Sequence, residues 1–468
     1  MLFNSLTFCI FLPVVLLLVG RAGLNRRNWI LLAASYVFYG AWDWRFLALL
    51  MGSTVVDYTV ARLMDAADDS PRRKTLLVIS MVTNLSVLGF FKYFNFFIGS
   101  AVSLVQSLGG EINRPALQII LPVGISFYTL QAMSYTIDVY WRRMPAIQSL
   151  RDFALYVAYF PQLVAGPIER ATALLPQIQS PGRVTPERIN IGLMLMIVGF
   201  TKKMLIADSI ANITGPVYSN PAAFTAGELI QAAYLYTFQI YCDFSGYSDI
   251  ARGVSELLGI RLMQNFQQPY LSQSVTEFWR RWHISLSSWL RDYLYIPLGG
   301  SRRGEVRTYV NVLLTWLICG LWHGAAWTFV VWGGLNGVYI AIERFFGIAR
   351  TPPVTPRSPG QWAKRVVATV LTFHLIVVTF IVFPSPTFTD LWHYLTGIAV
   401  LDNLSAVGML PLLVGAAVFL IDIPQNAAND DTVFLRLPWW LQSPLYAGLV
   451  FAMLLYGERE VPFIYFQF

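Results

Sequence analysis

The chain contains only four histidines, and two of them stand where an imidazole could do chemistry. His323 lies within CGLWHGAAW, in the middle of an apolar stretch. An ionisable side chain at membrane depth is costly and is by default a functional candidate that faces the protein interior. Its two neighbouring glycines permit close helix packing or a local break. The alternative is a neutral imidazole with one hydrogen bond in a helix bundle, and this structural role is favoured for His374 and His393.

His283 stands in the most polar long stretch of the chain, EFWRRWHISLSSWLRDYLYIPLGG. Ser274 or Thr276 is a plausible helix cap before this block, and Pro297 with two glycines ends it. The pattern predicts an amphipathic helix over 276–295 with His283 on its apolar side. Such a helix either dips into the protein or anchors it at the membrane surface, where tryptophan marks the headgroup level and arginine the anionic leaflet.

Cys319 precedes His323 by four residues, which is one helical turn. A Cys–His nucleophile pair is therefore one hypothesis. A small buried packing residue is the commoner role of such a cysteine. The three cysteines, Cys9, Cys242 and Cys319, show no CxxC spacing, so the sequence predicts neither a disulfide framework nor a zinc site.

Polar residues recur in two further apolar stretches. YCDFSGYSDIARG carries Asp243 and Asp249, which either help a cavity bind substrate or pair with Arg252 and cap helices. PVGISFYTLQAMSYTIDVYW carries Tyr128 and Gln131, which suit hydrogen bonds between helices and a substrate tunnel equally well. Together with the polar block, these motifs give the predicted substrate-binding residues: Asp243, Tyr241, Tyr128, Gln131, Asn265, Trp282, Arg280 and Arg281.

The composition indicates a polytopic membrane protein. Of 468 residues, 56% are hydrophobic and 13% are charged, whereas soluble proteins carry about 25% charged residues. The formal net charge is +7. Lys and Arg nevertheless form short clusters between apolar runs, where they set topology, so we expect no nucleic-acid partner. The opening MLFNSLTFCIFLPVVLLLVG has no basic start and no cleavage pattern, which predicts a retained first span rather than a signal peptide.

Apolar runs predict about ten to twelve crossings, because a membrane helix needs roughly 20 apolar residues; some runs are short enough to be broken or re-entrant. Even numbers of runs separate the basic clusters near residues 26, 73 and 143, which places all three in the cytoplasm. The same rule places 261–307 and the proline-rich, irregular 344–365 loop there, and the N-terminus outside. We predict one all-α membrane domain over the whole chain, 1–468. The candidate runs are 5–20, 28–41, 46–64, 75–98, 118–140, 152–166, 189–207, 226–243, 306–322, 324–343, 366–384, 405–422 and 440–456.

Several of these motifs resemble those of a known family. NFQQPYLSQSVTEFWRRWHISLSSWLRDYLYIPLGG, followed by LWHGAAWTFVVWGGLNG, is similar to the signature of the membrane-bound O-acyltransferase (MBOAT) family. The similarity is to the bacterial branch of the alginate O-acetylation membrane protein and the related D-alanyl transfer protein of teichoic acids. PVGISFYTLQAMSYTIDVYW, YFPQLVAGPIER, YCDFSGYSDIARG and the closing FIYFQF resemble that branch too, so the similarity covers essentially the whole chain.

The resemblance implies a fold, a reaction and two active-site residues. The family fold is a helical bundle in which oblique and broken helices enclose a tunnel through a thinned part of the membrane. His323 matches the catalytic histidine, and His283, forty residues earlier, matches its partner position. The implied reaction is acyl transfer from a thioester to a hydroxyl. An imidazole with a pKa of about 6.5 is suited to take the proton of that hydroxyl. His323 is the expected base, and His283 is expected to orient the acyl carbonyl or stabilise its oxyanion.

The resemblance also implies a donor and partners. The expected donor is cytoplasmic acetyl-CoA, acting as a substrate, with no permanently bound cofactor and no metal. Arginines at 280–307 suit CoA phosphates or an acidic carrier protein, although the positive-inside rule alone accounts for them. The acetyl group is expected to cross a bacterial inner membrane to a periplasmic acetyltransferase. That partner belongs to a polysaccharide synthesis and secretion complex and would modify an exopolysaccharide such as alginate or cellulose.

Two kinds of alternative remain open at this point. The transferred group could be D-alanyl or another acyl group, destined for a cell-envelope polymer. The chain could instead be a secondary transporter with Asp57, Asp138 and Asp243 as ion sites, or an idle scaffold of a polysaccharide complex. Transporters of that kind usually contain paired repeats, and the sequence has no second copy of the 265–300 block.

Overall fold

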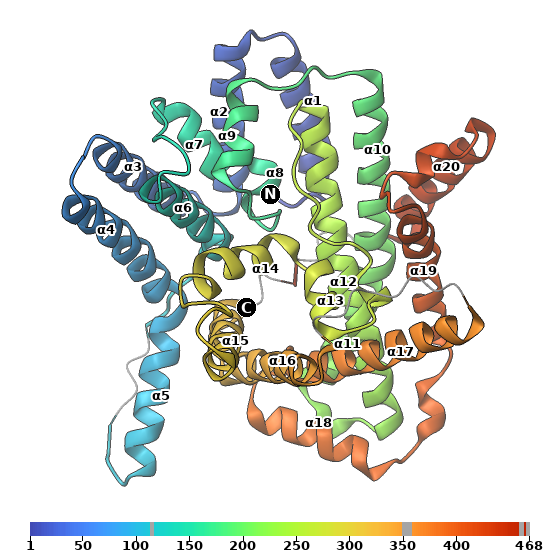
Figure 1. Cartoon of the computed structure of the whole chain (residues 1–468). Helices are drawn as coiled ribbons and strands as arrows, with labels where there is room; N and C mark the ends of the chain where they lie inside the picture. Colours follow the sequence, from blue (N-terminus) through green and yellow to red (C-terminus); the bar gives the residue numbers. More distant parts are fainter. Residues whose placement is uncertain (113–116, 349–357, 458–462, 465–468) are drawn as a thin grey trace. The chain divides into compact units, whose positions relative to one another are not determined.

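The computed structural model describes residues 1–112, 117–348, 358–457 and 463–464. Over these residues every regular element is a helix, which confirms the predicted all-α class (Figure 1). The chain folds into two compact units. The first comprises Met1–Ile189 with Val254–Leu262, and the second comprises Asn190–Gly253 with Met263–Phe468. Each unit is described by itself, and a single domain over the whole chain stays a prediction.

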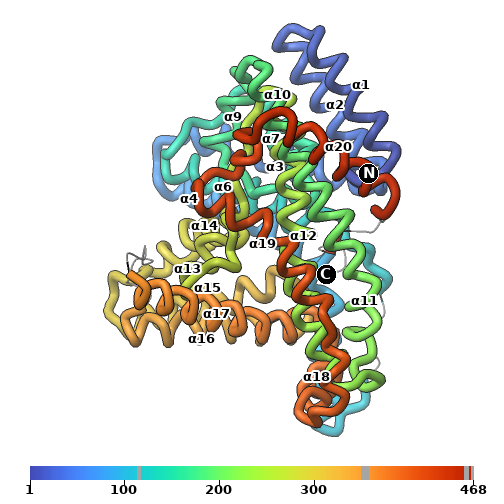
Figure 2. The backbone as a smooth tube through the Cα atoms, turned by 90° about the vertical axis from the view of Figure 1, so that its right-hand side faces the viewer, coloured from blue at the N-terminus to red at the C-terminus, as the bar shows by residue number. Residues whose placement is uncertain are grey.

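Helices α1 to α9 form the first unit. Within it α3, α4 and α6 lie side by side (Figures 1 and 2). Asp57 of α3 is buried and accepts hydrogen bonds from Ser80 (2.6 Å) and Asn84 (2.9 Å) of α4. A buried carboxylate needs such partners, so Asp57 bonds helices together here. The bounds are α1 (Leu6–Gly20), α2 (Leu24–Asp43), α3 (Arg45–Asp65), α4 (Ser70–Leu88), the π-helix η1 (Gly89–Tyr93), α5 (Phe94–Ser107), α6 (Ile125–Tyr140), α7 (Leu150–Ala158), α8 (Phe160–Leu163) and α9 (Ala171–Gln179).

The second unit contains the two candidate histidines. It takes in almost all of α10, most of α12 and every helix that follows. The bounds are α10 (Pro186–Phe200), η2 (Thr201–Ala207), α11 (Asp208–Ser219), η3 (Pro221–Ala223), α12 (Ala226–Leu257), η4 (Pro269–Leu271), α13 (Val275–Arg281), α14 (Ile284–Leu290), η5 (Arg291–Tyr295), α15 (Glu305–His323), α16 (Trp327–Phe345), α17 (Pro359–Val382), α18 (Phe388–Val400), η7 (Leu404–Val407), α19 (Leu410–Ala428), η8 (Val433–Arg436) and α20 (Trp439–Tyr456).

A tight helical hairpin, α15 and α16, carries His323 at its turn (Figure 2). Two glycines allow the helices to touch. A Cβ added at Gly320 would fall on the Phe329 carbonyl oxygen, and one added at Gly333 would fall on that of Trp316. Small residues at such contacts let helix backbones approach closely. The hairpin therefore fixes His323 against the facing helix.

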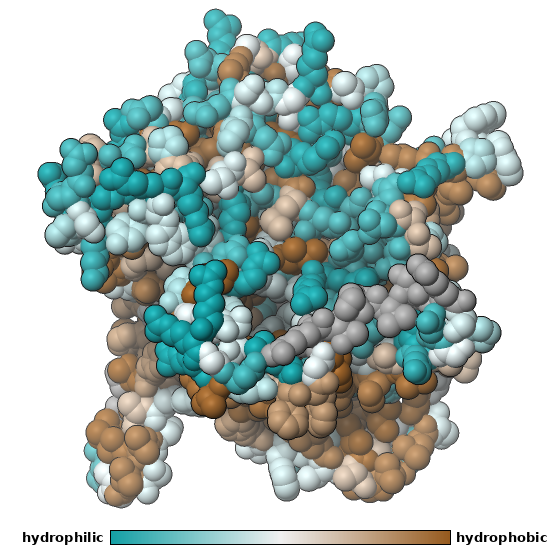
Figure 3. Space-filling view, viewed as in Figure 1, coloured by the Kyte–Doolittle hydropathy of each residue, from teal (hydrophilic) through white to brown (hydrophobic). Residues whose placement is uncertain are grey.

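Five helical runs in the described part of the chain are long and apolar enough to cross a membrane. Every predicted run overlaps a helix, but several of these helices are short, such as α6 with 16 residues and α7 with 9. The estimate of ten to twelve crossings therefore stays a prediction. Figure 3 shows hydrophobic side chains gathered over α16 and α18, as expected of a lipid-facing surface. The five runs are Arg45–Asp65, Ser70–Ser107, Pro186–Ser219, Pro359–Val382 and Leu404–Ala428.

The predicted irregular loop over 344–365 is partly helical. The helix α17 already begins at Pro359, where the Ser358 side chain accepts a hydrogen bond from the Gln361 backbone N–H at 3.4 Å. Serine before a first-turn proline is a helix start signal, because proline lacks the N–H that the first turn leaves unpaired. The prediction is therefore wrong for 344–345, which end α16, and for 359–365, and residues 349–357 lie outside the described part of the chain.

Candidate active site

The polar block folds as two short helices rather than one. Between α13 and α14 the chain turns at His283, whose φ of 44° is left-handed. The predicted continuous helix over 276–295 is therefore wrong at this point, and its apolar face is not one surface. The expected cap is confirmed at Ser274, whose hydroxyl accepts a hydrogen bond from the Glu277 N–H at 3.0 Å.

The segment before α13 explains the break. The Asn265 carbonyl oxygen accepts a hydrogen bond from the Ile284 N–H at 2.9 Å, and its side-chain Oδ1 accepts one from the Ser285 N–H at 3.1 Å. On the other side of the turn, the Gln267 N–H donates to the Arg281 carbonyl oxygen at 2.9 Å. Partners that are distant in sequence thus take the backbone groups that a continuous helix would bond within itself.

The His283 ring is enclosed and oriented. Its Nδ1 lies 3.3 Å from Asn265 Oδ1 and 3.4 Å from Ser285 Oγ, and the Phe244 ring packs edge-on at 4.6 Å. Because Asn265 Oδ1 already accepts the Ser285 N–H, it acts as an acceptor and Nδ1 is the donor. The lone pair of the neutral ring then lies on Nε2. Burial lowers the pKa of His283 to about 3, because desolvation penalises the imidazolium.

His323 ends α15 inside a cage of aromatic rings. The ring centroids of Trp332 and Phe383 lie 5.0 and 5.4 Å from that of His323, and the side chain is 3% exposed. Gly324 follows in extended conformation, and a Cβ there would fall on the Phe329 ring. The helix therefore stops where its last side chain meets the cage.

One tryptophan touches both histidines. The Trp322 ring lies 6.1 Å from the His283 ring and 4.9 Å from the His323 ring, measured between centroids. Two histidines forty positions apart in the sequence thus contact one aromatic side chain, and their role as a catalytic pair stays a prediction. The histidine cluster below means His283, Trp322 and His323. Cys319 is a free, buried cysteine one turn before His323 on α15, and the favoured role as a packing residue stays a prediction.

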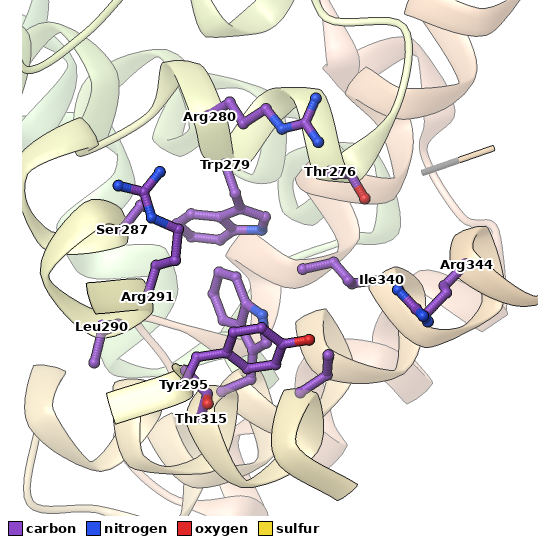
Figure 4. Close-up of a pocket in the computed structure, with 12 residues that line it drawn as sticks. Thr276, Trp279, Arg280, Ser287, Leu290, Arg291, Tyr295, Thr315, Ile340 and Arg344 are labelled. Atoms are coloured by element: carbon purple, nitrogen blue, oxygen red, sulfur yellow. The ribbon is translucent and has the colours of Figure 1, made fainter. Parts of the chain in front are cut away.

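Three predicted substrate-binding residues lie near this cluster, within its packing. Asn265 holds the His283 ring, as described above. The buried Trp282 packs on the Phe266 ring at 5.1 Å, and Tyr241 packs on Trp282 at 6.0 Å. These side chains pack around His283 and do not line an open cavity in the pocket of Figure 4.

Asp243 and Tyr241 belong to an ionic network that the motif analysis missed. Lys203 lies 2.7 Å from both Asp243 and Asp208, and its side chain is 6% exposed. Lys202 pairs with Asp249 at 2.9 Å. Tyr241 donates its hydroxyl hydrogen to Asp422 at 2.9 Å. The sequence did contain a signal for this network, namely two adjacent lysines inside the apolar run 189–207. Because buried charges require partners, these lysines predict nearby carboxylates.

The predicted arginines have different surroundings. Arg281 pairs with Glu277 at 2.6 Å and donates to the Asn426 side chain at 2.9 Å, so it ties α13 to α19. Arg280 is exposed and lines a pocket of about 320 Å³ together with Arg344 and ten other residues (Figure 4). The full lining is Thr276, Trp279, Arg280, Ser287, Leu290, Arg291, Tyr295, Val312, Thr315, Trp316, Ile340 and Arg344.

Tyr128 and Gln131 lie on α6 in the first unit, separate in the chain from the histidine cluster. Both are buried, and Gln131 donates from Nε2 to the Tyr156 carbonyl oxygen at 2.7 Å. Within its unit, Gln131 therefore bonds α6 to α7. In the part of the chain that the structure describes, no three His, Cys, Asp or Glu side chains are grouped as metal ligands would be.

The helical fold and the five apolar runs define a helical membrane protein. Residues 142–383, which include both histidines, match the model of the membrane-bound O-acyltransferase family. The chain belongs to this family and is an O-acyltransferase.

Three bacterial relatives are named as acyltransferases. A probable alginate O-acetylase of Pseudomonas aeruginosa is 42% identical over 92% of this chain and 86% of the relative. A peptidoglycan O-acetyltransferase of Helicobacter pylori is 32% identical over 97% of this chain and 87% of the relative. A more distant teichoic acid D-alanyltransferase of Streptococcus thermophilus is 27% identical over 58% of this chain and 69% of the relative. This similarity supports a membrane O-acetyltransferase.

Proposed function

We propose that this protein takes an acetyl group from cytoplasmic acetyl-CoA and passes it across the bacterial inner membrane for O-acetylation of an exopolysaccharide such as alginate or cellulose. The observation that carries the proposal is the histidine cluster, in which two buried imidazoles each contact the Trp322 ring. The similarity to a probable alginate O-acetylase supports acetyl as the group and a polysaccharide as its destination. A periplasmic acetyltransferase is the proposed partner that receives the acetyl group.

In the proposed mechanism His323 acts as the general base. An acceptor hydroxyl loses its proton to the His323 ring as its oxygen attacks the thioester carbonyl carbon, and the carbon–sulfur bond then breaks to release the thiolate. Base catalysis of this kind contributes about 10²–10⁴-fold. The thiolate is a good leaving group, so the imidazolium can return its proton to the departing sulfur or to solvent.

His283 has a different role in this proposal. Its neutral ring directs the Nε2 lone pair away from Asn265, so it accepts a hydrogen bond from a donor N–H or O–H. With a pKa of about 3 it is a poor base, which makes it a positioning residue. The oxyanion contact expected from the family resemblance would require the other tautomer, with hydrogen on Nε2.

Purified protein tests the donor directly. We expect thiol release and acetyl transfer from acetyl-CoA, and no reaction with a D-alanyl carrier protein under the same conditions. Activity with the D-alanyl carrier alone would contradict the acetyl proposal and favour the D-alanyl alternative. Transport of an ion or solute without thioester cleavage would contradict both.

A further inference from the structure

The last two turns of α19 and its C-cap carry four polar side chains. Asp422, Gln425, Asn426 and Asn429 are spaced by three, one and three residues, so they share one side of the helix. Asp422 is 0% exposed and Gln425 is 4% exposed, although α19 belongs to a run apolar enough to cross a membrane. Buried polar groups require partners, so contact with water at the membrane surface does not account for these two. The four residues are named the polar face of α19 below.

Three members of this face bond to both ends of the stretch 267–281, which leads directly into His283. Each member accepts a hydrogen bond at a side-chain oxygen. The three bonds run from Gln267 Nε2 to Asn429 Oδ1 (3.1 Å), from Gln268 Nε2 to Gln425 Oε1 (3.1 Å) and from Arg281 Nη1 to Asn426 Oδ1 (2.9 Å). One face of one helix thus holds the start and the end of the stretch that carries α13.

These contacts lie beside two strained positions of the backbone. Gln268 and His283 both have a φ of 44°, a left-handed conformation that residues other than glycine rarely adopt. Such conformations cost free energy and persist only where the surrounding structure secures them. Gln268 is itself bonded to α19, and Arg281 stands two residues before His283. The polar face of α19 therefore secures the backbone at both left-handed residues.

The fourth member, Asp422, reaches the same site through Tyr241. The helices α12 and α19 lie side by side (Figure 2), and the Tyr241 hydroxyl donates to Asp422 Oδ2 at 2.9 Å. The Tyr241 ring lies 6.0 Å from the rings of both Trp282 and Phe266, and the Phe266 ring stacks at 6.5 Å on that of His283. A hydrogen bond to a carboxylate is stronger than one between neutral groups, so Asp422 fixes the ring that packs behind this aromatic layer.

We propose that the polar face of α19 positions His283 for acyl transfer, by holding the left-handed turn and the aromatic layer against which the imidazole lies. Its members are positioning residues, because they act through Gln268, Arg281 and Tyr241 rather than on the reacting atoms. The inference rests on the proposed function, in which His283 orients a substrate. The family match covers residues 142–383 and ends before α19, so this assignment adds a helix to the machinery of the site.

Chemical modification of His283 in purified full-length protein tests the assignment without any acyl transfer. Diethyl pyrocarbonate modifies unprotonated imidazoles, and peptide mass spectrometry measures each of the four histidines separately. We expect Gln425→Leu and Asn426→Leu each to raise the modification rate of the buried His283 about tenfold, because the turn opens more often when one of its hydrogen bonds is lost. The exposed His374 and His393 are internal references whose rates should not change.

Two further variants show whether the accepting oxygen is responsible. Asn426→Asp keeps an oxygen for Arg281 and should restore most of the protection of His283. Gln442→Leu is the matched control, since Gln442 is a half-buried glutamine of α20 that donates to Tyr446 Oη at 3.2 Å. It should leave His283 as protected as in the wild type. Asn426→Ala is a smaller change at the same half-buried position and should act in the same direction as leucine.

Steady-state kinetics provide a second measurement that a merely structural role would not change. We expect Asn426→Leu to lower kcat about tenfold and to leave KM for the thioester within about twofold, with recovery in Asn426→Asp. A lower thermal unfolding midpoint with kcat unchanged would show that the bond only stabilises the fold.

The two measurements separate this inference from the proposed function. Unchanged modification of His283 in Gln425→Leu, Asn426→Leu and Asn426→Ala would overturn the positioning role of α19. Faster modification of His283 with an unchanged kcat would instead contradict the role of His283 in acyl transfer, while the hold of α19 on the turn would stand.

Discussion

At the scale of single residues, the two imidazoles of the candidate site differ in their surroundings. His323 closes α15 inside a cage of rings, whereas His283 is held at Nδ1 by Asn265 and Ser285. The first is placed for proton transfer in the proposed mechanism. The second is fixed in one orientation and kept neutral, so it can position a ligand but cannot carry charge at physiological pH.

Replacing His323 should remove the reaction and leave the fold intact. We expect His323→Ala to lower acetyl transfer by about 10²–10⁴-fold, the usual contribution of a general base. His374→Ala is the control, because His374 is exposed and its Nδ1 lies 2.7 Å from the Val370 carbonyl oxygen of its own helix. Acetylation by intact cells and elution as a single species in detergent are the measurements. Near-normal acetylation by His323→Ala would make this histidine structural.

The pH dependence should distinguish the two histidines. Burial lowers the pKa of His283 to about 3, so its ring binds no proton between about pH 5 and 8 and gains one only in strong acid. We expect His283→Asn to lower kcat without moving the acid limb of the pH–rate profile in that range. Measurement of kcat from pH 5 to 8 for both proteins checks this. If the acid limb of the pH–rate profile shifts in His283→Asn, the group that titrates in this range is His283.

At the scale of elements, the hairpin of α15 and α16 sets the position of His323 through its glycines. The contact at Gly320 and Gly333 leaves no room for a methyl group between the backbones. The opposite end of α16 bonds α13 through Glu343. One helix pair thus places His323 at its turn and lines the pocket of Figure 4 along its length.

Widening this hairpin should destabilise the protein. A Cβ at Gly333 would meet the Trp316 carbonyl oxygen, so we expect Gly333→Ala to lower the unfolding free energy by about 1–3 kcal/mol, as overpacking does. Gly334→Ala is the matched control, because its Cβ would meet only the flexible Leu317 Cδ2, at 3.3 Å. Thermal unfolding in detergent measures both. Equal midpoints for the two variants would show that the helices can separate without penalty.

The sequence predicts elements better than the breaks between them. Apolar runs located the helices, and the serine cap of α13 was visible as a local signal. The turn at His283 was not predictable from the block itself, since Asn265, eighteen residues earlier, takes the backbone groups that would have continued the helix. Arg344 was missed for a similar reason, because only the folding of α16 beside α13 brings it to Arg280. The two histidines drew attention because they are scarce and stand in distinctive motifs, and the structure places both beside Trp322.

At the scale of the whole molecule, the distribution of charge defines an expected orientation in the membrane. Five helical runs can cross a bilayer by length and composition. The basic clusters near residues 26, 73, 143 and 302 sit between apolar runs, and the positive-inside rule places them in the cytoplasm. That orientation would give the polar block that carries His283 access to a cytoplasmic donor.

Cysteine labelling tests the orientation. In a cysteine-free background, single cysteines at the exposed Ser301 and Ser358 should react with a membrane-impermeant thiol reagent only after the cytoplasmic side is opened. A cysteine at Leu108, which is 80% exposed at the end of α5, is a control for reagent access in a different loop. Labelling of both serine positions in intact spheroplasts would invert the topology and remove the basis for a cytoplasmic donor.

The lysines of η2 also constrain how the protein is made. Lys202 and Lys203 lie inside the run Pro186–Ser219, and a lysine at the centre of a lone membrane helix opposes insertion by about 2.5–3.5 kcal/mol. Lys203 pairs with Asp208 in its own run and with Asp243 on α12, whereas Lys202 pairs with Asp249 on α12, the next long helix to leave the ribosome. Insertion of the run Pro186–Ser219 is therefore favoured once α12 supplies the carboxylates that pair with its lysines. We therefore expect an order in biosynthesis, in which the lysine-bearing helix enters the lipid only after α12 has supplied Asp243 and Asp249 as its partners.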